Sequence, residues 1–483
     1  MGWLWTRPAL LALSGLGLLC VAAGLAFAAG GEDHAQQVQR GPGPSDGWRT
    51  DLAQPSAQIE AYAGAQSVAP GEALALYVRS PQRYRIDVYR IGWYGGSGGS
   101  LVACLPACTA TADPQAQPDA SLDQQTGEYR APWRQTDSIP VGADWPSGYY
   151  QADVVGEDGK AFPVPFVVRG TNAPLLVVAP VNTWEAYNEW GGRSAYSDPV
   201  SAKVVSFDRP YRLDDAQLPW RLEYPLVRFL ESSGYRADYV TDADVDADPG
   251  LLTRYHAVLF AGHSEYWTLR MRAGLENATG HGTDVAVFGG NALYWQARYA
   301  DGARRSLAEY RSASEDPDPS PRTKTVRWRD APLNAPECSV LGIEWQGGGS
   351  ESGAGNHFDY VGSADSPWFA GTGLGPGATL KGLVDYEWDA VQQGCPRRPQ
   401  GLTVLFHHEG PSTPQPRGVY TSTFLTQDAD AVTFTTPSNA RVFAAGSNYF
   451  VYGIDPSGGD AGHPRDPRLV RFVQNMLDDM AKR

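Results

Sequence analysis

The chain has 483 residues, of which 42% are hydrophobic and 19% are charged. This length allows two or three domains with sizeable cores, and the composition excludes a fibrous or disordered chain. The formal net charge is −15, and lysine and arginine are scattered along the sequence. No basic face is therefore expected, which argues against nucleic acid or anionic lipid as a partner.

The first 31 residues have the features of a secretory leader. They contain a single cation, Arg7, an apolar run from Ala9 to Ala29 and the small-residue site Ala26-Phe27-Ala28. We expect cleavage after Ala28 and export to the cell envelope or the extracellular space. The alternative is that the apolar run, about 20 residues long, remains as a membrane anchor.

Of the five cysteines, Cys20 lies in the leader and the other four lie in the body of the chain. An even number in an exported chain predicts two disulfides. Pairing near neighbours joins Cys104 to Cys108 and Cys338 to Cys395, although four cysteines allow three pairings. A zinc site at Cys104 and Cys108 would need a second ligand pair, and the sequence has none nearby.

Residues 32–56 are rich in Gln, Gly and Pro and predict a flexible spacer. Between residues 57 and 170, short stretches of alternating polarity are separated by Pro/Gly turns, which predicts an antiparallel β-sandwich domain. The expected strands cover 59–63, 74–78 continuing at 84–89, 149–154 and 162–168, with a glycine-dense loop at 92–99.

From residue 171 to 483, buried strands alternate with helices. This order predicts a doubly wound, class I amidotransferase-like α/β domain. The expected strands cover 175–179, 239–240, 257–261, 285–288, 402–406 and 441–444, and the expected helices follow Pro219, run from Thr268 to Gly280, cover 293–295 and start at Asp466. Residues 301–395 are polar and rich in Gly and Pro, and predict an irregular insertion that folds over the crevice of the sheet.

The strand at 257–261 organises this domain, because its unbroken apolar run is typical of a strand buried on both faces. Ligands of open α/β sheets bind at the carboxyl ends of such strands. His263 and Glu265 follow directly and are the leading candidates for a site. The alternative is that both are solvated loop residues.

The sequence lacks the motifs of several common catalytic and binding sites. The α/β domain has no G-x-S-x-G elbow, and the turn after 285–288 carries Asn291 where an amidotransferase has its cysteine. The glycine cluster at 92–99 lacks the lysine and following helix of a phosphate loop. His357 and the pair at 407–408 lack a third metal ligand nearby and indicate surface features.

A metal site is the remaining kind of catalytic site that the sequence supports. Glu265 follows a central strand, Tyr187 follows the first strand of the same sheet, and Tyr150 ends the β-domain. These three side chains could converge where the two domains meet, although each tyrosine could instead be an interface aromatic. Phenolate and carboxylate oxygens are hard donors, which suit a hard, highly charged cation.

Six ordered motifs resemble the large (beta) subunit family of N,N-dimethylformamidase, and the similarity spans roughly residues 58–477. They are NTWEAYNEWGGRSAY (182–196), AGHSEYW (261–267), FGGNALYW (288–295), GTGL (371–374), GLVDYEWD (382–389) and VFAAGS (442–447).

This resemblance implies a mononuclear non-haem ferric ion held by two tyrosines and a glutamate. The glutamate corresponds to Glu265. One tyrosine corresponds to Tyr187, with Tyr196 as the alternative, and the other to Tyr150, with Tyr149 as the alternative.

The resemblance also places His263, Asn291 and Glu387 around the substrate. Glu387 would be the general base that activates water, and His263 and Asn291 would donate hydrogen bonds to the developing oxyanion. The expected substrate is a small amide, cleaved at its C–N bond. A homo-oligomer or a small partner subunit is expected, and membrane contact only through an uncleaved anchor. The competing hypothesis is a non-catalytic cell-envelope binding protein that keeps the fold.

Overall fold

The computed structural model describes residues 39–49, 58–212, 221–348, 357–410, 428–455 and 465–481. All of them belong to the compact unit that begins at Gln36. The predicted leader and most of the predicted spacer lie outside the described residues. Among the described helices, none has the length and apolarity that a membrane crossing requires.

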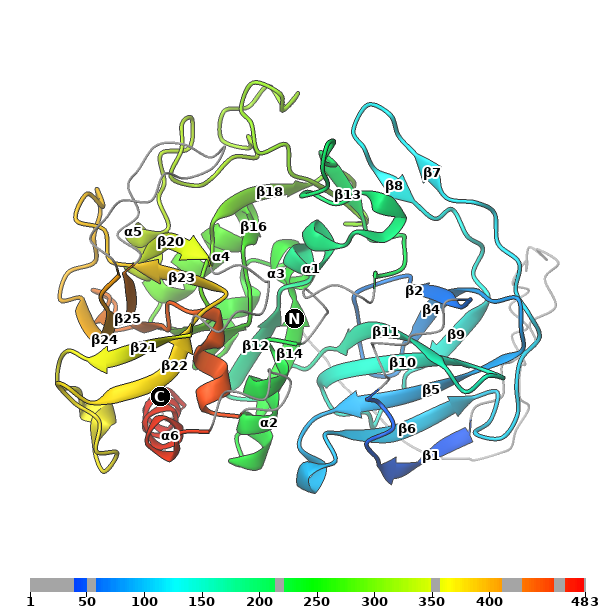
Figure 1. Cartoon of the computed structure of the whole chain (residues 1–483), viewed down its shortest axis with the longest axis horizontal. Helices are drawn as coiled ribbons and strands as arrows, with labels where there is room; N and C mark the ends of the chain where they lie inside the picture. The colour runs from blue at the N-terminus through cyan, green and yellow to red at the C-terminus, as the bar shows by residue number, and fades with distance from the viewer. Residues whose placement is uncertain are drawn as a thin grey trace, which may run out of the picture. The chain divides into compact units, whose positions relative to one another are not determined.

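In the N-terminal region, two sheets share one apolar core (Figure 1, blue to cyan). A six-stranded sheet has the order β1-β6-β5-β10-β11-β3, and a three-stranded sheet has the order β2-β4-β9. Alternate residues of β4 and β5 point into this core, as expected for strands with one buried face. The strands are β1 (Gln39–Pro44), β2 (Glu60–Ala63), β3 (Ser67–Val68), β4 (Ala73–Arg79), β5 (Tyr84–Ile91), β6 (Gly99–Leu105), β9 (Asp137–Pro140), β10 (Gly148–Gly156) and β11 (Ala161–Val168).

Two expectations for this region are corrected. The stretches 74–78 and 84–89 do not form one strand, because β4 and β5 lie in different sheets. Part of the expected spacer is β1, which pairs antiparallel with β6. The label of an antiparallel β-sandwich stays a prediction, and one pair, β3 with β11, is parallel.

A nine-stranded sheet forms the centre of the remaining chain, with the order β14-β12-β15-β17-β26-β25-β24-β21-β22. The first five strands are parallel and the rest pair antiparallel. Their bounds are β12 (Leu175–Ala179), β14 (Ala237–Thr241), β15 (Ala257–Ala261), β17 (Asp284–Phe288), β21 (Phe358–Gly362), β22 (Thr379–Val384), β24 (Thr403–His408), β25 (Ala429–Thr435) and β26 (Arg441–Ala444).

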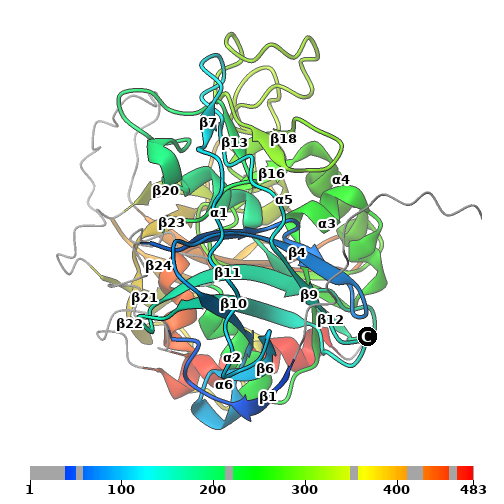
Figure 2. The same cartoon turned by 90° about the vertical axis from the view of Figure 1, so that its right-hand side faces the viewer.

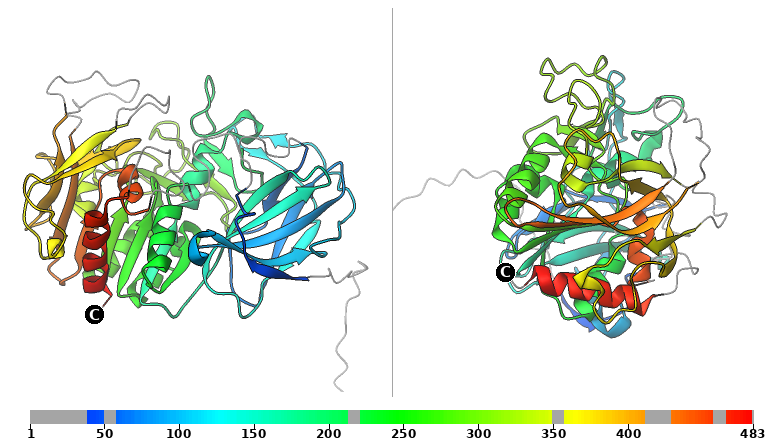
Figure 3. Two further views of the ribbon diagram at one scale, coloured as in Figure 1. Left: turned by 60° about the horizontal axis from the view of Figure 1, so that its bottom comes forward. Right: turned by 90° about the vertical axis from the view of Figure 1, so that its left-hand side faces the viewer.

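Both faces of this sheet are covered, which explains why β15 is apolar at every position. Leu259 and Ala261 pack with α2 (Tyr224–Ser232) and α6 (Pro467–Met480). Val258 and Phe260 point the other way and pack with α3 (Asp242–Ala247) and α4 (Leu269–Gly280). Figures 2 and 3 show α6, in red, beside α2, and Gln474 of α6 donates a hydrogen bond to Ser233 at the end of α2.

The expected helix at 293–295 is wrong. Leu293 has φ +58°, and the N–H groups of Tyr294 and Trp295 both donate to the carbonyl of Glu265. This turn leads into β18 (Trp295–Tyr299), which pairs parallel with β16 (Tyr266–Thr268). Tertiary hydrogen bonds to the 264–265 segment therefore override the local helical pattern.

The region 301–395 is more than an irregular insertion, because its strands β21 and β22 extend the main sheet.

The remaining elements of the described chain are short. They are α1 (Val181–Tyr187), α5 (Cys338–Leu341), β7 (Ser121–Leu122), β8 (Tyr129–Arg130), β13 (Val204–Ser206), β19 (Ser306–Ala308), β20 (Glu344–Gly348), β23 (Glu387–Ala390) and the 3-10 helices η1 (Tyr94–Gly96), η2 (Trp190–Gly192), η3 (Leu251–Arg254), η4 (Pro367–Phe369) and η5 (Asn448–Gly453).

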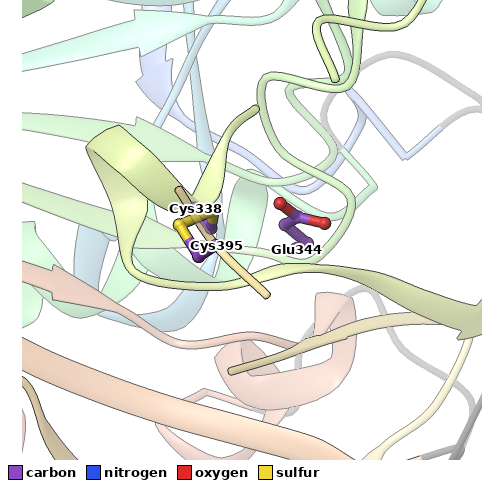
Figure 4. A group of neighbouring side chains, drawn as sticks. All are labelled: Cys338, Glu344 and Cys395. Carbon is purple, nitrogen blue, oxygen red and sulfur yellow. A yellow bond between two sulfur atoms is a disulfide. The ribbon is translucent and has the colours of Figure 1, made fainter. Parts of the chain in front are cut away.

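Both predicted disulfides are confirmed: Cys104 bonds to Cys108, and Cys338 bonds to Cys395. Figure 4 shows the second disulfide beside Glu344, whose carboxylate lies within 4.8 Å of both sulfurs. Because the sulfur atoms are bonded to each other, this group does not offer thiolate ligands to a metal.

Candidate functional site

Three neighbouring parallel strands, β12, β15 and β17, end at the same edge of the main sheet. Each is followed by a predicted site residue. Tyr187 ends α1, which follows β12, while His263 and Glu265 follow β15 and Asn291 follows β17. The carboxyl ends of the strands thus bring together residues that are far apart in sequence, as the sequence predicted for an open α/β sheet.

Two tyrosines hold the carboxylate of Glu265. The Tyr187 hydroxyl donates to Oε2 at 2.9 Å, and the Tyr196 hydroxyl donates to Oε1 at 3.0 Å. The two phenol rings stack with their centroids 4.2 Å apart. The Tyr196 hydroxyl also lies 2.6 Å from that of Tyr266. Four oxygen-bearing side chains therefore meet at one point, and three of them are the residues that the sequence proposed as ligands or alternatives.

Tyr196 forms the outer side of this group. It remains 37% exposed, whereas Glu265 is only 2% exposed. The Arg311 guanidinium carbon lies 4.7 Å from the centre of the Tyr196 ring, close enough for a cation–π contact. Tyr196 thus reaches Glu265 and Tyr266 with its hydroxyl, although part of the residue remains in contact with solvent.

The expectation that Tyr150 joins Glu265 is corrected. Tyr150 lies in the core of the N-terminal region, where it stacks on Trp145 with centroids 5.3 Å apart. Its hydroxyl donates to the carbonyl of Pro146 at 2.7 Å. The alternative, Tyr149, packs against Trp184 and Tyr239. The place beside Glu265 belongs to Tyr196, so the cluster of three oxygen donors lies entirely in the 171–483 region.

A second group of polar side chains adjoins the first. The Nε2 atom of His263 lies 2.8 Å from Glu387 Oε2 and 3.4 Å from Glu265 Oε2. The side-chain amide of Asn291 donates to the same Glu387 oxygen at 2.7 Å. The three residues predicted to surround the substrate therefore meet. His263 connects them to Tyr187, Tyr196 and Glu265, which we call the tyrosine–glutamate group.

The sequence around α1 explains how Glu265 is positioned. Thr183 Oγ1 accepts hydrogen bonds from the backbone N–H groups of Glu265 at 3.0 Å and Tyr266 at 3.3 Å. The Asn182 side chain donates to the Tyr266 carbonyl at 3.2 Å. The first turn of α1 thus fixes the backbone of the 265–266 segment, and its last residue, Tyr187, binds the Glu265 carboxylate.

A glycine is required directly before His263. Gly262 has φ +61°, a left-handed conformation that residues with a Cβ rarely adopt. A Cβ there would lie 2.1 Å from Glu223 Oε1, which also accepts a hydrogen bond from Trp184 at 3.4 Å. The close approach of this buried carboxyl therefore depends on Gly262.

The electrostatics of the site are dominated by burial and by several carboxyl groups. Burial raises the pKa of Tyr187 and Tyr196 well above the usual value for a phenol, and Glu265 adds to the effect. Burial also raises the pKa of Glu265, although His263 opposes it. Burial alone would lower the pKa of His263, but the carboxylates of Glu387, Glu265 and Glu223 raise it to about 9.

Sequence reasoning missed three residues near the cluster: Tyr266, Glu309 and Arg311. Tyr266 lies inside the AGHSEYW motif, so its position next to Glu265 was a usable signal. Glu309 is 1% exposed, and neither of its carboxylate oxygens has a hydrogen-bond partner among the described residues. Glu309 and Arg311 lie in the expected insertion, where no sequence pattern pointed to the site.

Other histidines form separate pairs. His407 Nδ1 lies 2.7 Å from Asp430, and His357 contacts Asp385. Among the described residues, the only cluster with metal-ligand spacing built from His, Cys, Asp and Glu side chains contains the Cys338–Cys395 disulfide. The tyrosine–glutamate group is therefore the strongest candidate for binding a hard cation, because its donors are all oxygen.

No curated protein matches the chain. Residues 85–463 match the family described as N,N-dimethylformamidase beta subunit-like, C-terminal. The matched region is more than half of the sequence and contains both polar groups of the site, from Tyr187 to Glu387. The chain belongs to the N,N-dimethylformamidase beta subunit-like family.

Proposed function

We propose that the protein is an exported, iron-dependent hydrolase that cleaves the C–N bond of a small amide. Membership of the N,N-dimethylformamidase beta subunit-like family supports a dimethylformamidase-like hydrolase. The observation that carries the proposal is the arrangement of the Tyr187, Tyr196 and Glu265 oxygens next to the pair of buried His263 and partly exposed Glu387.

The residues fit a ferric ion. Tyr187, Tyr196 and Glu265 would hold it, because two phenolates and one carboxylate are hard donors whose three negative charges offset a 3+ ion. Both hydroxyl protons now lie between oxygens of this group, and an acidic cation would displace them. When bound, such an ion polarises an amide carbonyl and lowers the pKa of water.

The second polar group supplies the proton chemistry. Glu387 takes a proton from water while the water oxygen attacks the carbonyl carbon, and the same proton then passes to the amine nitrogen as the C–N bond breaks. His263 and Asn291, which both reach Glu387 Oε2, orient this carboxylate. Their predicted role as hydrogen-bond donors to the oxyanion stays part of the proposal.

Elemental analysis and an activity screen of small amides test this function together. Iron near one atom per chain, a visible phenolate-to-iron absorption and hydrolysis of at least one amide would support the enzyme. Glu387→Gln should keep the iron and lose the hydrolysis. A colourless protein that stays free of iron after loading, and that hydrolyses none of the amides, would favour the non-catalytic binding protein instead.

Export is also part of the proposal, because the predicted leader lies outside the described residues. The two disulfides support it, since such bonds persist in oxidising compartments. Because the family description names a subunit, we further propose that the chain assembles with copies of itself or with a small partner subunit. Light scattering of protein purified from its source organism would distinguish a monomer from either assembly. The class I amidotransferase-like arrangement stays a prediction.

A further inference from the structure

The backbone of the turn between β17 and β18 packs unusually close to the backbone of two other segments of the site. A Cβ on Gly289 would lie 2.1 Å from the carbonyl oxygen of Gly262, and one on Gly290 would lie 2.4 Å from that of Glu387. Only glycine allows both approaches. Asn291, the next residue, has φ +51°, in the left-handed region that L-residues seldom occupy.

Two buried side chains from distant parts of the chain hold this turn. The backbone N–H of Asn291 donates to Asp389 Oδ1 at 2.8 Å, and that of Gly290 donates to Asn448 Oδ1 at 2.8 Å. Asp389 is 2% exposed and Asn448 is fully buried. Two consecutive N–H groups are thus fixed by separate elements, β23 and η5.

The consequence for the site lies in the Asn291 side chain. With the backbone held in this conformation, its amide reaches Glu387 Oε2 at 2.7 Å. Asp389 lies two residues after Glu387 on β23, so one short strand supplies both the carboxylate and the anchor for its partner. A carboxyl group buried this deeply normally costs stability. An apolar residue of similar size would fill the space with a smaller loss of stability, but it could not accept the hydrogen bond from the Asn291 N–H.

We propose that Asp389 and Asn448 are positioning residues that clamp the 289–291 turn and set the Asn291 amide against Glu387. This inference deepens the proposed amide hydrolysis and rests on it. Neither residue touches the reacting atoms. Both act through Asn291, and their effect on turnover therefore disappears when the Asn291 side chain is removed.

Three variants of the iron-loaded protein test the clamp, with N,N-dimethylformamide or the best amide of the screen as the probe. Asp389→Leu removes the acceptor, Asp389→Asn keeps an oxygen that accepts the same hydrogen bond, and Asn448→Leu removes the second anchor. We expect Asp389→Leu to lower kcat by about 100-fold with little change in KM, as for loss of one well-placed donor. Asp389→Asn should retain most of the turnover.

A double-mutant cycle separates positioning from general destabilisation. In the Asn291→Ala background, Asp389→Leu should cause no further loss of kcat. A further loss as large as in the wild-type background would overturn the proposal, as would equal damage from Asp389→Asn and Asp389→Leu. If Asp389→Leu does not fold, Asn448→Leu replaces it in the same cycle.

A crystal structure of the Asp389→Leu variant, or of Asn448→Leu if the former does not fold, gives a readout that does not depend on turnover. We expect the Asn291 amide to move away from Glu387 while the Tyr187, Tyr196 and Glu265 group keeps its place. An unmoved Asn291 would refute the clamp. If the wild-type protein hydrolyses no amide, the proposed function fails, but this structural comparison still decides whether Asp389 positions the turn.

Discussion

At the scale of single residues, the polar side chains of the site hydrogen-bond to one another. Both oxygens of Glu265 accept phenol protons, and one oxygen of Glu387 lies within hydrogen-bond distance of an imidazole and an amide. Such hydrogen bonds offset the cost of burying a charged carboxylate. Removal of one donor therefore changes both the local hydrogen bonding and the set of ligands for an ion.

The first prediction compares two tyrosines. Tyr196→Phe should remove a ligand, so iron content and the visible phenolate absorption should fall by more than half. Tyr150→Phe, its matched control, loses only the hydrogen bond to Pro146 and should keep the iron, at a cost of about 1 kcal/mol in stability. Iron retained in the first variant and lost in the second would restore Tyr150 as the ligand.

The second prediction concerns the protons on the ligands. Burial keeps the pKa of Tyr187 and Tyr196 well above the usual value, so both are protonated before an ion binds. Binding must therefore release protons, and the affinity for iron should rise as the pH increases. Calorimetry in buffers of different ionisation enthalpy measures the number released. A value near zero would show that the ion binds without these phenols.

At the scale of elements, the loop after β19 is fixed by one aspartate. Asp316 is 3% exposed and accepts hydrogen bonds from the Arg298 guanidinium at 2.9 and 3.1 Å and from the backbone and hydroxyl of Thr325 at 2.8 Å. Burial alone would raise the pKa of Asp316, but these donors outweigh it and lower the pKa to about 2.

The third prediction follows from this shift. A carboxyl whose pKa is lower in the folded than in the unfolded state contributes stability above its unfolded pKa of about 4, and the contribution is lost as the pH falls towards 2. Asp316→Asn should therefore cost about 2 kcal/mol near pH 7. Urea unfolding of the wild-type protein and of Asp316→Asn checks this. The difference between their free energies of unfolding should become smaller below about pH 4. A difference that does not vary with pH would exclude the charged form of Asp316 as its source.

The strands and loops of the site differ in how well the sequence predicts them. The strands β12, β15 and β17 were predictable because each is an apolar run with both faces covered, and that pattern placed His263 and Glu265 at a strand end. Tyr196 could not be chosen over Tyr150 in this way. It lies in a loop without periodicity, and only the fold decides which hydroxyl faces Glu265. The strand β1 was hidden for a related reason, because Gly and Pro are compatible with an edge strand as well as with a spacer.

At the scale of the whole molecule, the two disulfides differ in how much chain they close. Cys104 and Cys108 are 4 residues apart, whereas Cys338 and Cys395 are 57 apart and join α5 to the segment before β24. The loss of entropy that a cross-link imposes on the unfolded chain grows with the length of the closed loop.

The fourth prediction ranks the two bonds. Replacing Cys338 and Cys395 by serine should lower the free energy of unfolding by up to about 4 kcal/mol, and replacing Cys104 and Cys108 by about 2 kcal/mol. Thermal melting of the two double variants tests the order. Equal melting temperatures would mean that strain or packing, rather than loop length, determines the contribution of each bond.

The position of β1 makes the edge of β6 sensitive to the loss of residues from the N-terminal part of the chain. This strand covers the outer edge of β6, and Trp48 just beyond it donates to the Ser97 carbonyl at 3.0 Å and packs on Tyr224. A cut after Ala28 would spare it, whereas trimming beyond residue 44 would leave the β6 ladder open to pairing with other chains. Removal of β1 would therefore promote association between chains through the exposed edge of β6.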